Sequence, residues 1–183
     1  MGWLLLIAGI ALWSGAHFWK RLAPASREAM GDKGKGVAAI GILASLVLMV
    51  LGYRMVDFIP VWSPPAFLTH VNNLLMLLAF LLFGMSATTG RLRGWMRHPQ
   101  LAAVKTWALA HLLVNGDLAS ILLFGGMLAW AVTSVILINK AGPWENRPEP
   151  GEAKGDVKLV VIALVLYAVV ALIHLWLGVS PFS

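Results

Sequence analysis

Residues 97–117 read RHPQLAAVKTWALAHLLVNGD, and the rest of the chain is organised around this stretch. Pro99 predicts the first turn of a helix, where its missing N–H costs no hydrogen bond. Asn115, Gly116 and Asp117 predict a tight turn, with Asp117 capping the helix that follows. The helix between them has about 17 residues and a length of about 26 Å, which just spans the hydrocarbon core of a bilayer.

This short apolar helix carries polar and aromatic side chains on one face. Trp107, His111 and Asn115 are spaced four residues apart, so they share that face. Lys105 lies elsewhere on the helix wheel, and we expect its ammonium group to snorkel toward the cytoplasmic end. Polar groups at membrane depth are costly and usually face the interior of a bundle. We therefore expect the other helices to pack around the face that carries His111.

The composition is that of a membrane protein. Of the 183 residues, 60% are hydrophobic and 12% are charged, and the mean hydropathy is +0.82. The net charge of +6 comes from basic residues in short loops and does not indicate nucleic-acid binding. The chain has no cysteine, which excludes disulfides, thiolate-ligated haem and covalently attached c-type haem.

The apolar segments predict one all-α domain over residues 1–183, a six-helix transmembrane bundle in the lipid bilayer. The predicted spans cover about residues 2–22, 37–53, 66–89, 99–115, 118–138 and 159–179. Gly125 and Gly126 predict a close helix contact in the fifth span. The loop Lys140–Lys158 is rich in proline, glycine and charge, which predicts a flexible connector.

The distribution of charge orients this bundle. Twelve of the 14 lysines and arginines lie in the loops that follow the first, third and fifth spans, or at the end of the first span next to its loop. Arg54 lies on the other side, and Lys105 lies within the fourth span. The positive-inside rule places the basic loops in the cytoplasm and both termini in the periplasm.

In a chain without cysteine, the histidines carry most of the possible chemistry. His17, His70, His111 and His174 fall in four different spans, and His98 lies at the cytoplasmic mouth of the fourth. A lone intramembrane histidine often only hydrogen-bonds to a neighbouring helix. Four on four helices indicate a cofactor, an ion path or a proton relay, and neutral imidazole is the natural axial ligand of haem iron.

Depth in the bilayer separates these histidines into two groups. Counted from the cytoplasmic end, His111 lies about 20 Å deep and His174 about 23 Å deep at 1.5 Å per residue. His70 lies near the outer end of the third span, whereas His17 is about 7 Å from the cytoplasmic end. Depth alone therefore groups His70, His111 and His174, and leaves His17 nearer His98.

Several motifs together resemble the NnrU family. The most specific part is residues 97–120, with RHPQ, KxW and AHLLxNGDLAS in succession. The run LFGGMLAW at 123–130, the WxxP element at 62–65 and the ending from Tyr167 to Gly178 are also similar. The resemblance implies a multi-span protein of the bacterial inner membrane that is associated with nitric oxide metabolism in denitrifying bacteria.

The NnrU family is in turn similar to the plant and cyanobacterial zeta-carotene isomerase, a haem b protein. This similarity implies two iron ligands, His111 by the central motif and His17 by its place at the end of the first span. His70 and His174 are then expected as pocket residues or replacement ligands. The cysteine proposed as an alternative ligand in the isomerase has no counterpart in this chain.

Three functions remain open from the sequence. The first, which we favour, is a b-type haem-binding protein that supports nitric oxide or nitrogen-oxide metabolism by electron transfer or sensing, with a redox partner or respiratory complex. The second is a haem-dependent cis–trans isomerase of a carotenoid or another apolar polyene. The third is a cofactor-free assembly or transport subunit. If haem is bound, Trp107 and Asn115 are expected to line its site, because they share the face of His111.

Overall fold

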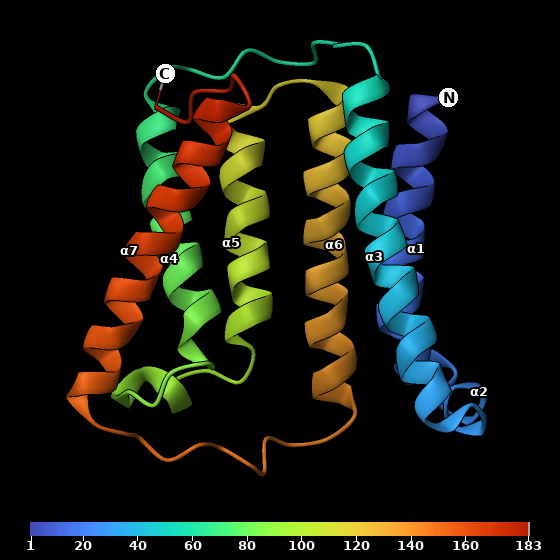
Figure 1. Ribbon diagram of the computed structural model, residues 1–183, viewed down its shortest axis with the longest axis vertical. Helices are drawn as coiled ribbons and strands as arrows, with labels where there is room; N and C mark the ends of the chain where they lie inside the picture. The colour runs from blue at the N-terminus through green and yellow to red at the C-terminus, as the bar shows by residue number, and fades with distance from the viewer. Residues whose placement is uncertain (183) are drawn as a thin grey trace.

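The computed structural model describes residues 1–182, and most of these residues are helical. The elements are α1 (Gly2–Leu22), α2 (Pro24–Ala29), α3 (Gly31–Met55), α4 (Leu68–Met85), the 3-10 helix η1 (Arg91–Gly94), α5 (Pro99–Val114), α6 (Leu118–Lys140) and α7 (Ala153–Trp176). The six long helices run up and down along one common direction (Figure 1). The prediction of an all-α fold is confirmed for the described residues.

Several helix ends differ from the predicted spans. α3 begins at Gly31 instead of residue 37, and α7 begins at Ala153 instead of residue 159. The predicted spans include only the apolar stretch of each helix. The additional first turns contain charged residues and glycine, which can lie in water outside the membrane. α4 covers Leu68–Met85 instead of 66–89, and α7 ends at Trp176 ahead of Gly178, whose φ of +81° favours a helix end.

The helices form two groups that α6 joins. In the first group α1 and α3 pack as an antiparallel pair, and Gly52 lies directly against the backbone of Leu6, where a side chain would not fit. The second group contains α4, α5 and α7. α6 contacts α5 in one group and α1 in the other (Figure 1). Its predicted small-residue contact is made by Gly126, which packs against Ile10, whereas Gly125 faces open space.

Each group has its own core. The first core lies where α1, α3 and α6 meet, and Val104 and Trp107 of α5 pack against it. Its buried members are Leu6, Met49, Ala119, Met127, Trp130 and Ala131. The second core lies among α4, α5 and α7, with buried members Leu82, Met85, Ala103 and Leu159.

The helices show a multi-pass membrane protein. Five of them, α1, α3, α4, α6 and α7, are long and apolar enough to cross a membrane. α5 has 16 residues and is shorter than these. Both ends of the described chain lie at one end of the bundle, and the loops after α1, α4 and α6 lie at the other (Figure 1). We call these the terminal end and the basic end. A sixth crossing by α5 and the periplasmic location of the termini stay predictions.

At the terminal end, the turn between α5 and α6 holds the connection from α3 to α4. The Gly116 carbonyl accepts hydrogen bonds from the backbone N–H of Val61 (2.8 Å) and of Trp62 (3.0 Å). Gly116 also lies against the Trp62 carbonyl, so that a Cβ would collide with it. Asp117 caps α6 as predicted, because its Oδ1 accepts from the Ser120 N–H at 3.0 Å.

At the basic end, the connector Lys140–Lys158 is tied to the segment between α4 and α5. The Arg147 Nε donates to the Gly94 carbonyl (2.9 Å), and the Leu92 N–H donates to the Asp156 carboxyl (3.1 Å). The prediction of a flexible connector is therefore corrected, because these hydrogen bonds and the helical start of α7 fix much of its path. Charged residues of this loop and of the first turn of α7 make these hydrogen bonds to η1.

Candidate functional site

His111 sits near the terminal end of α5 between two aromatic rings. Its ring centroid is 5.3 Å from Trp107 and 4.6 Å from Phe124 of α6. Its Nδ1 lies 3.0 Å from the Trp107 carbonyl oxygen, one turn earlier. Because a carbonyl can only accept, Nδ1 carries the proton and Nε2 keeps its lone pair. His111 therefore presents the atom that binds a metal or accepts a hydrogen bond.

His17 and His174 repeat the same arrangement on other helices. The Nδ1 of His17 is 2.8 Å from the Trp13 carbonyl, and the Nδ1 of His174 is 2.8 Å from the Val170 carbonyl. In all three cases the backbone one turn earlier fixes the ring and its tautomer. A metal-binding imidazole usually has its second nitrogen held in this way, which orients the ring and raises its basicity.

The structure places His111 and His174 at the terminal end of the bundle, whereas His17 lies toward the basic end of α1. The His174 imidazole is close enough to His111 to interact with it electrostatically. Figure 1 shows α7 leaning toward α5 at the terminal end, where both residues lie. His17 contacts Trp130, whereas His111 contacts Phe124, and these two partners are separated by about 9 Å along α6 at 1.5 Å per residue. The pairing of His111 with His17 as iron ligands stays a prediction.

The described residues do not form a metal site built from protein side chains alone. Within residues 1–182, no group of three or more His, Asp or Glu side chains is placed to hold a metal ion. Haem asks less of the protein, because the porphyrin supplies four ligands to its iron and one or two imidazoles complete the set.

The other two histidines occupy the two ends of the bundle. His70 is exposed and lines an open depression at the terminal end with Pro64, Thr69, Val114 and Phe182 among its neighbours. It shares this end with His111 and His174.

His98 lies at the basic end, where its Nε2 is 2.9 Å from the Asn139 side-chain oxygen. Arg97 donates to the same oxygen at 3.2 Å. These two side chains fasten the start of α5 to the last turn of α6, so we assign them a structural role.

Trp107 and Asn115 share the face of His111 in different ways. The Trp107 ring packs edge-on against Phe124 at 5.1 Å and belongs to the wall around the imidazole. The Asn115 side chain donates to the His111 carbonyl oxygen at 2.8 Å and closes the last turn of α5. Lys105 is half-buried. Among the described residues the two ion pairs are exposed, and neither contains Lys105.

A buried polar network beside this site was not predicted from the sequence. Ser120 links Tyr53 of α3 to Asp117, with its Oγ 2.8 Å from the Tyr53 hydroxyl and 2.5 Å from Asp117 Oδ2. Ser120 lies one turn before Phe124, the residue that packs on His111. The run NGDLAS contains Asp117 and Ser120 of this network, but nothing in the sequence indicated that Tyr53 would hydrogen-bond to Ser120.

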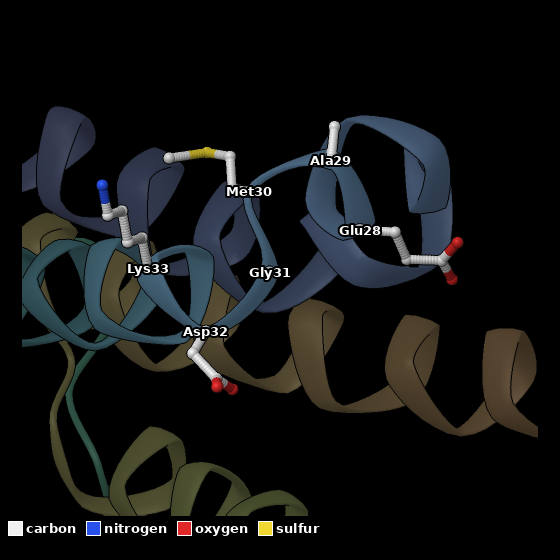
Figure 2. Close-up of a pocket in the computed structure, with 6 residues that line it drawn as sticks. All are labelled: Glu28, Ala29, Met30, Gly31, Asp32 and Lys33. Carbon is white, nitrogen blue, oxygen red and sulfur yellow. The ribbon is translucent and has the colours of Figure 1, made fainter.

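A surface depression at the α2–α3 corner carries no convergent chemistry. It is lined by Glu28, Ala29, Met30, Gly31, Asp32 and Lys33, and their side chains point in different directions (Figure 2). Asp32 is instead paired with Lys35 at 2.7 Å on the exposed surface.

Comparison with protein families identifies the family of this chain. The family model described as NnrU protein matches residues 5–181. The chain belongs to the NnrU family. The match covers the three helices that carry His17, His111 and His174, so these residues all lie within the NnrU region. No curated protein and no solved structure matches the chain.

Proposed function

We propose that this chain is a b-type haem-binding protein of the bacterial inner membrane that supports nitrogen-oxide metabolism by electron transfer. The observation that carries the proposal is that three intramembrane imidazoles make the same hydrogen bond to the backbone. His17, His111 and His174 each have Nδ1 hydrogen-bonded to the backbone, and within residues 1–182 the Nε2 of each has no protein partner. Free imidazole nitrogens in a membrane interior are costly, and an axial bond to haem iron would use them.

His111 is the first iron ligand in this proposal, and His174 is the second. Their shared place at the terminal end of α5 and α7 favours this pair, whereas the resemblance to the isomerase favours His17 in place of His174. Bound haem would supply a one-electron redox couple at this position. The backbone carbonyls of Trp107 and Val170 hold the two imidazoles in orientation.

The surrounding side chains would isolate such a group from water. Trp107 and Phe124 cover two sides of the His111 ring, and Phe124 is 7% exposed. If both His111 and His174 held the iron, the site would suit electron transfer, because no position would remain open for a substrate. The nitrogen-oxide part of the proposal is supported by membership of the NnrU family and by that family's association with nitric oxide metabolism.

The test is the absorption spectrum of the purified protein and of four histidine variants. We expect a low-spin b-haem spectrum in the parent protein. His111→Ala and His174→Ala should lose most of the haem or become high-spin, and His17→Ala should keep the parent spectrum. His98→Ala is the matched control, because His98 binds Asn139 at the basic end.

Each outcome of this experiment has a definite meaning. A parent protein that binds no haem, even after reconstitution, overturns the proposal and favours the cofactor-free alternative. Loss of the spectrum in His17→Ala with retention in His174→Ala reassigns the second ligand to His17. In cells, deletion should impair nitrite or nitric oxide reduction, and His111→Ala should fail to restore it. Normal nitric oxide turnover in the deletion strain, with accumulation of a cis-polyene, would instead support the isomerase.

A further inference from the structure

The segment between α4 and α5 carries a basic and apolar surface that the proposed function does not use. Its exposed residues are Arg91, Leu92 and Arg93 of η1 and the adjoining Trp95. Leu92 is 40% exposed and Trp95 is 67% exposed. Neither Arg91 nor Arg93 belongs to the two ion pairs found within residues 1–182. We call these four residues the η1 patch.

Hydrogen bonds to neighbouring segments hold the backbone of the η1 patch. The Leu92 N–H donates to the Asp156 carboxyl of α7 at 3.1 Å, and the Gly94 carbonyl accepts from the Arg147 Nε of the α6–α7 connector at 2.9 Å. Gly94 is buried, whereas the residues on either side of it are exposed. The side chains of the patch therefore project from a fixed backbone, and a ligand that binds them orders only the side chains.

The lengths of the flanking helices place the η1 patch at the depth of the lipid head groups. α4 has 18 residues and α5 has 16, which give about 27 Å and about 24 Å at 1.5 Å per residue. The hydrocarbon core of a bilayer is about 30 Å thick. A crossing by these two helices therefore leaves their connection at the membrane surface. Figure 1 shows this connection closer to the middle of the bundle than the α6–α7 connector.

Arginine and tryptophan at this depth suit a phospholipid with an anionic head group. A guanidinium binds phosphate oxygens through paired N–H donors. An indole lies at the boundary between head groups and acyl chains, where tryptophan is enriched. Two cationic side chains outside the ion pairs favour an anionic lipid over a zwitterionic one by charge complementarity. An acidic soluble protein would match the charges, but the exposed Leu92 and Trp95 at the bilayer surface favour a lipid.

We propose that the η1 patch binds an anionic phospholipid, such as phosphatidylglycerol, in the leaflet at the basic end of the bundle. Arg91 and Arg93 bind the phosphate, and Leu92 and Trp95 contact the glycerol backbone and the first acyl carbons. This proposal goes beyond haem binding and does not depend on it. The patch shares no residue with the proposed haem site at the terminal end, and lipid binding can be measured without haem. The two proposals therefore fail separately.

The experiment is titration of the detergent-solubilised full chain with phosphatidylglycerol and with phosphatidylcholine, with bound lipid counted by native mass spectrometry. The parent protein should bind one phosphatidylglycerol more tightly than phosphatidylcholine. Arg91→Gln combined with Arg93→Gln should weaken phosphatidylglycerol by about 30-fold, at about fivefold for each basic side chain beside an anionic lipid. Trp95→Ala should weaken both lipids, because the indole contacts a part that the two lipids share.

The matched control is Arg21→Gln combined with Lys33→Gln. It removes the same charge from exposed residues at the same end of the bundle, and it should keep the lipid preference of the parent. Arg91→Lys combined with Arg93→Lys keeps the charge but loses the paired donors, so its affinity should lie between those of the parent and the glutamine variant. Circular dichroism checks the folding of each variant.

Several outcomes would overturn the proposal. One is equal affinity of the parent protein for the two lipids. Another is an equal loss in the Arg21 and Lys33 control, which would show a general attraction of positive charge in place of a site. Unchanged binding of both lipids in Trp95→Ala would also overturn it. If the double glutamine variant does not fold, Arg93→Gln alone carries the same prediction at about fivefold.

Discussion

Replacing Ser120 by alanine should destabilise the protein more than any other loss of a single hydroxyl described above. The Asp117 carboxyl accepts from the Ser120 hydroxyl, so the Tyr53 hydroxyl must be the donor to Ser120. Ser120→Ala therefore removes two hydrogen bonds from a fully buried position. One hydrogen bond is worth about 0.5–1.5 kcal/mol, or up to about 3 kcal/mol with a charged acceptor, so the free energy of unfolding should fall by about 2–4 kcal/mol.

A double-mutant cycle with Tyr53→Phe gives the sharper measurement. Tyr53→Phe alone removes one bond and should cost about 1 kcal/mol, but in the Ser120→Ala background it should cost almost nothing. The assay is equilibrium unfolding in mixed detergent micelles followed by circular dichroism. A Ser120→Ala variant within about 0.5 kcal/mol of the parent, or fully additive effects of the two changes, would refute the network. Because Ser120 precedes Phe124 by one turn, the haem spectrum should also broaden in Ser120→Ala.

Three further predictions concern the packing and the topology. Gly116→Ala should cost about 1–3 kcal/mol, the usual cost of overpacking, because its Cβ meets the Trp62 carbonyl, and protease cleavage of the α3–α4 connection should report the displaced loop. Gly52→Val should separate α1 from α3 at Leu6 and lower the thermal midpoint, whereas the same change at an open glycine should not. Reporter fusions after Gly151 should indicate cytoplasm and C-terminal fusions periplasm, and the reverse pattern would invert the bundle.

The sequence was a good guide to the helices and a poorer guide to their ends. Apolar periodicity, Pro99 and the NGD turn located α5 and its neighbours, because these signals act over a few residues. The start of α7 at Ala153 is accompanied by contacts with η1 and by the hydrogen bond from the Leu92 N–H to the Asp156 carboxyl. Such tertiary contacts have no local signal in the sequence.

The candidate site was predictable in part. Helix spacing placed Trp107, His111 and Asn115 on one face, and a depth count grouped His111 with His174. The partners that come from other helices could not be predicted, because their choice depends on how the helices rotate when they pack. Phe124 beside His111 is one example. Trp130 is the other, because its contact with His17 joins α6 to α1.

The helix pair α5–α6 is fastened at both ends, by the turn held at Gly116 and by the hydrogen bonds of Arg97 and His98 to Asn139. Among residues 1–182, no such hydrogen bonds tie the terminal end of α7 to a neighbouring helix, and only 11% of its most apolar stretch is buried. Of the two imidazoles of the proposed haem pair, His111 therefore belongs to the more firmly held helix, and His174 to the less firmly held one. We therefore expect His111 to keep its position, and a change in its separation from His174 to come from a movement of α7. Ligand exchange at such a site would be controlled by the bilayer around α7 as much as by the protein.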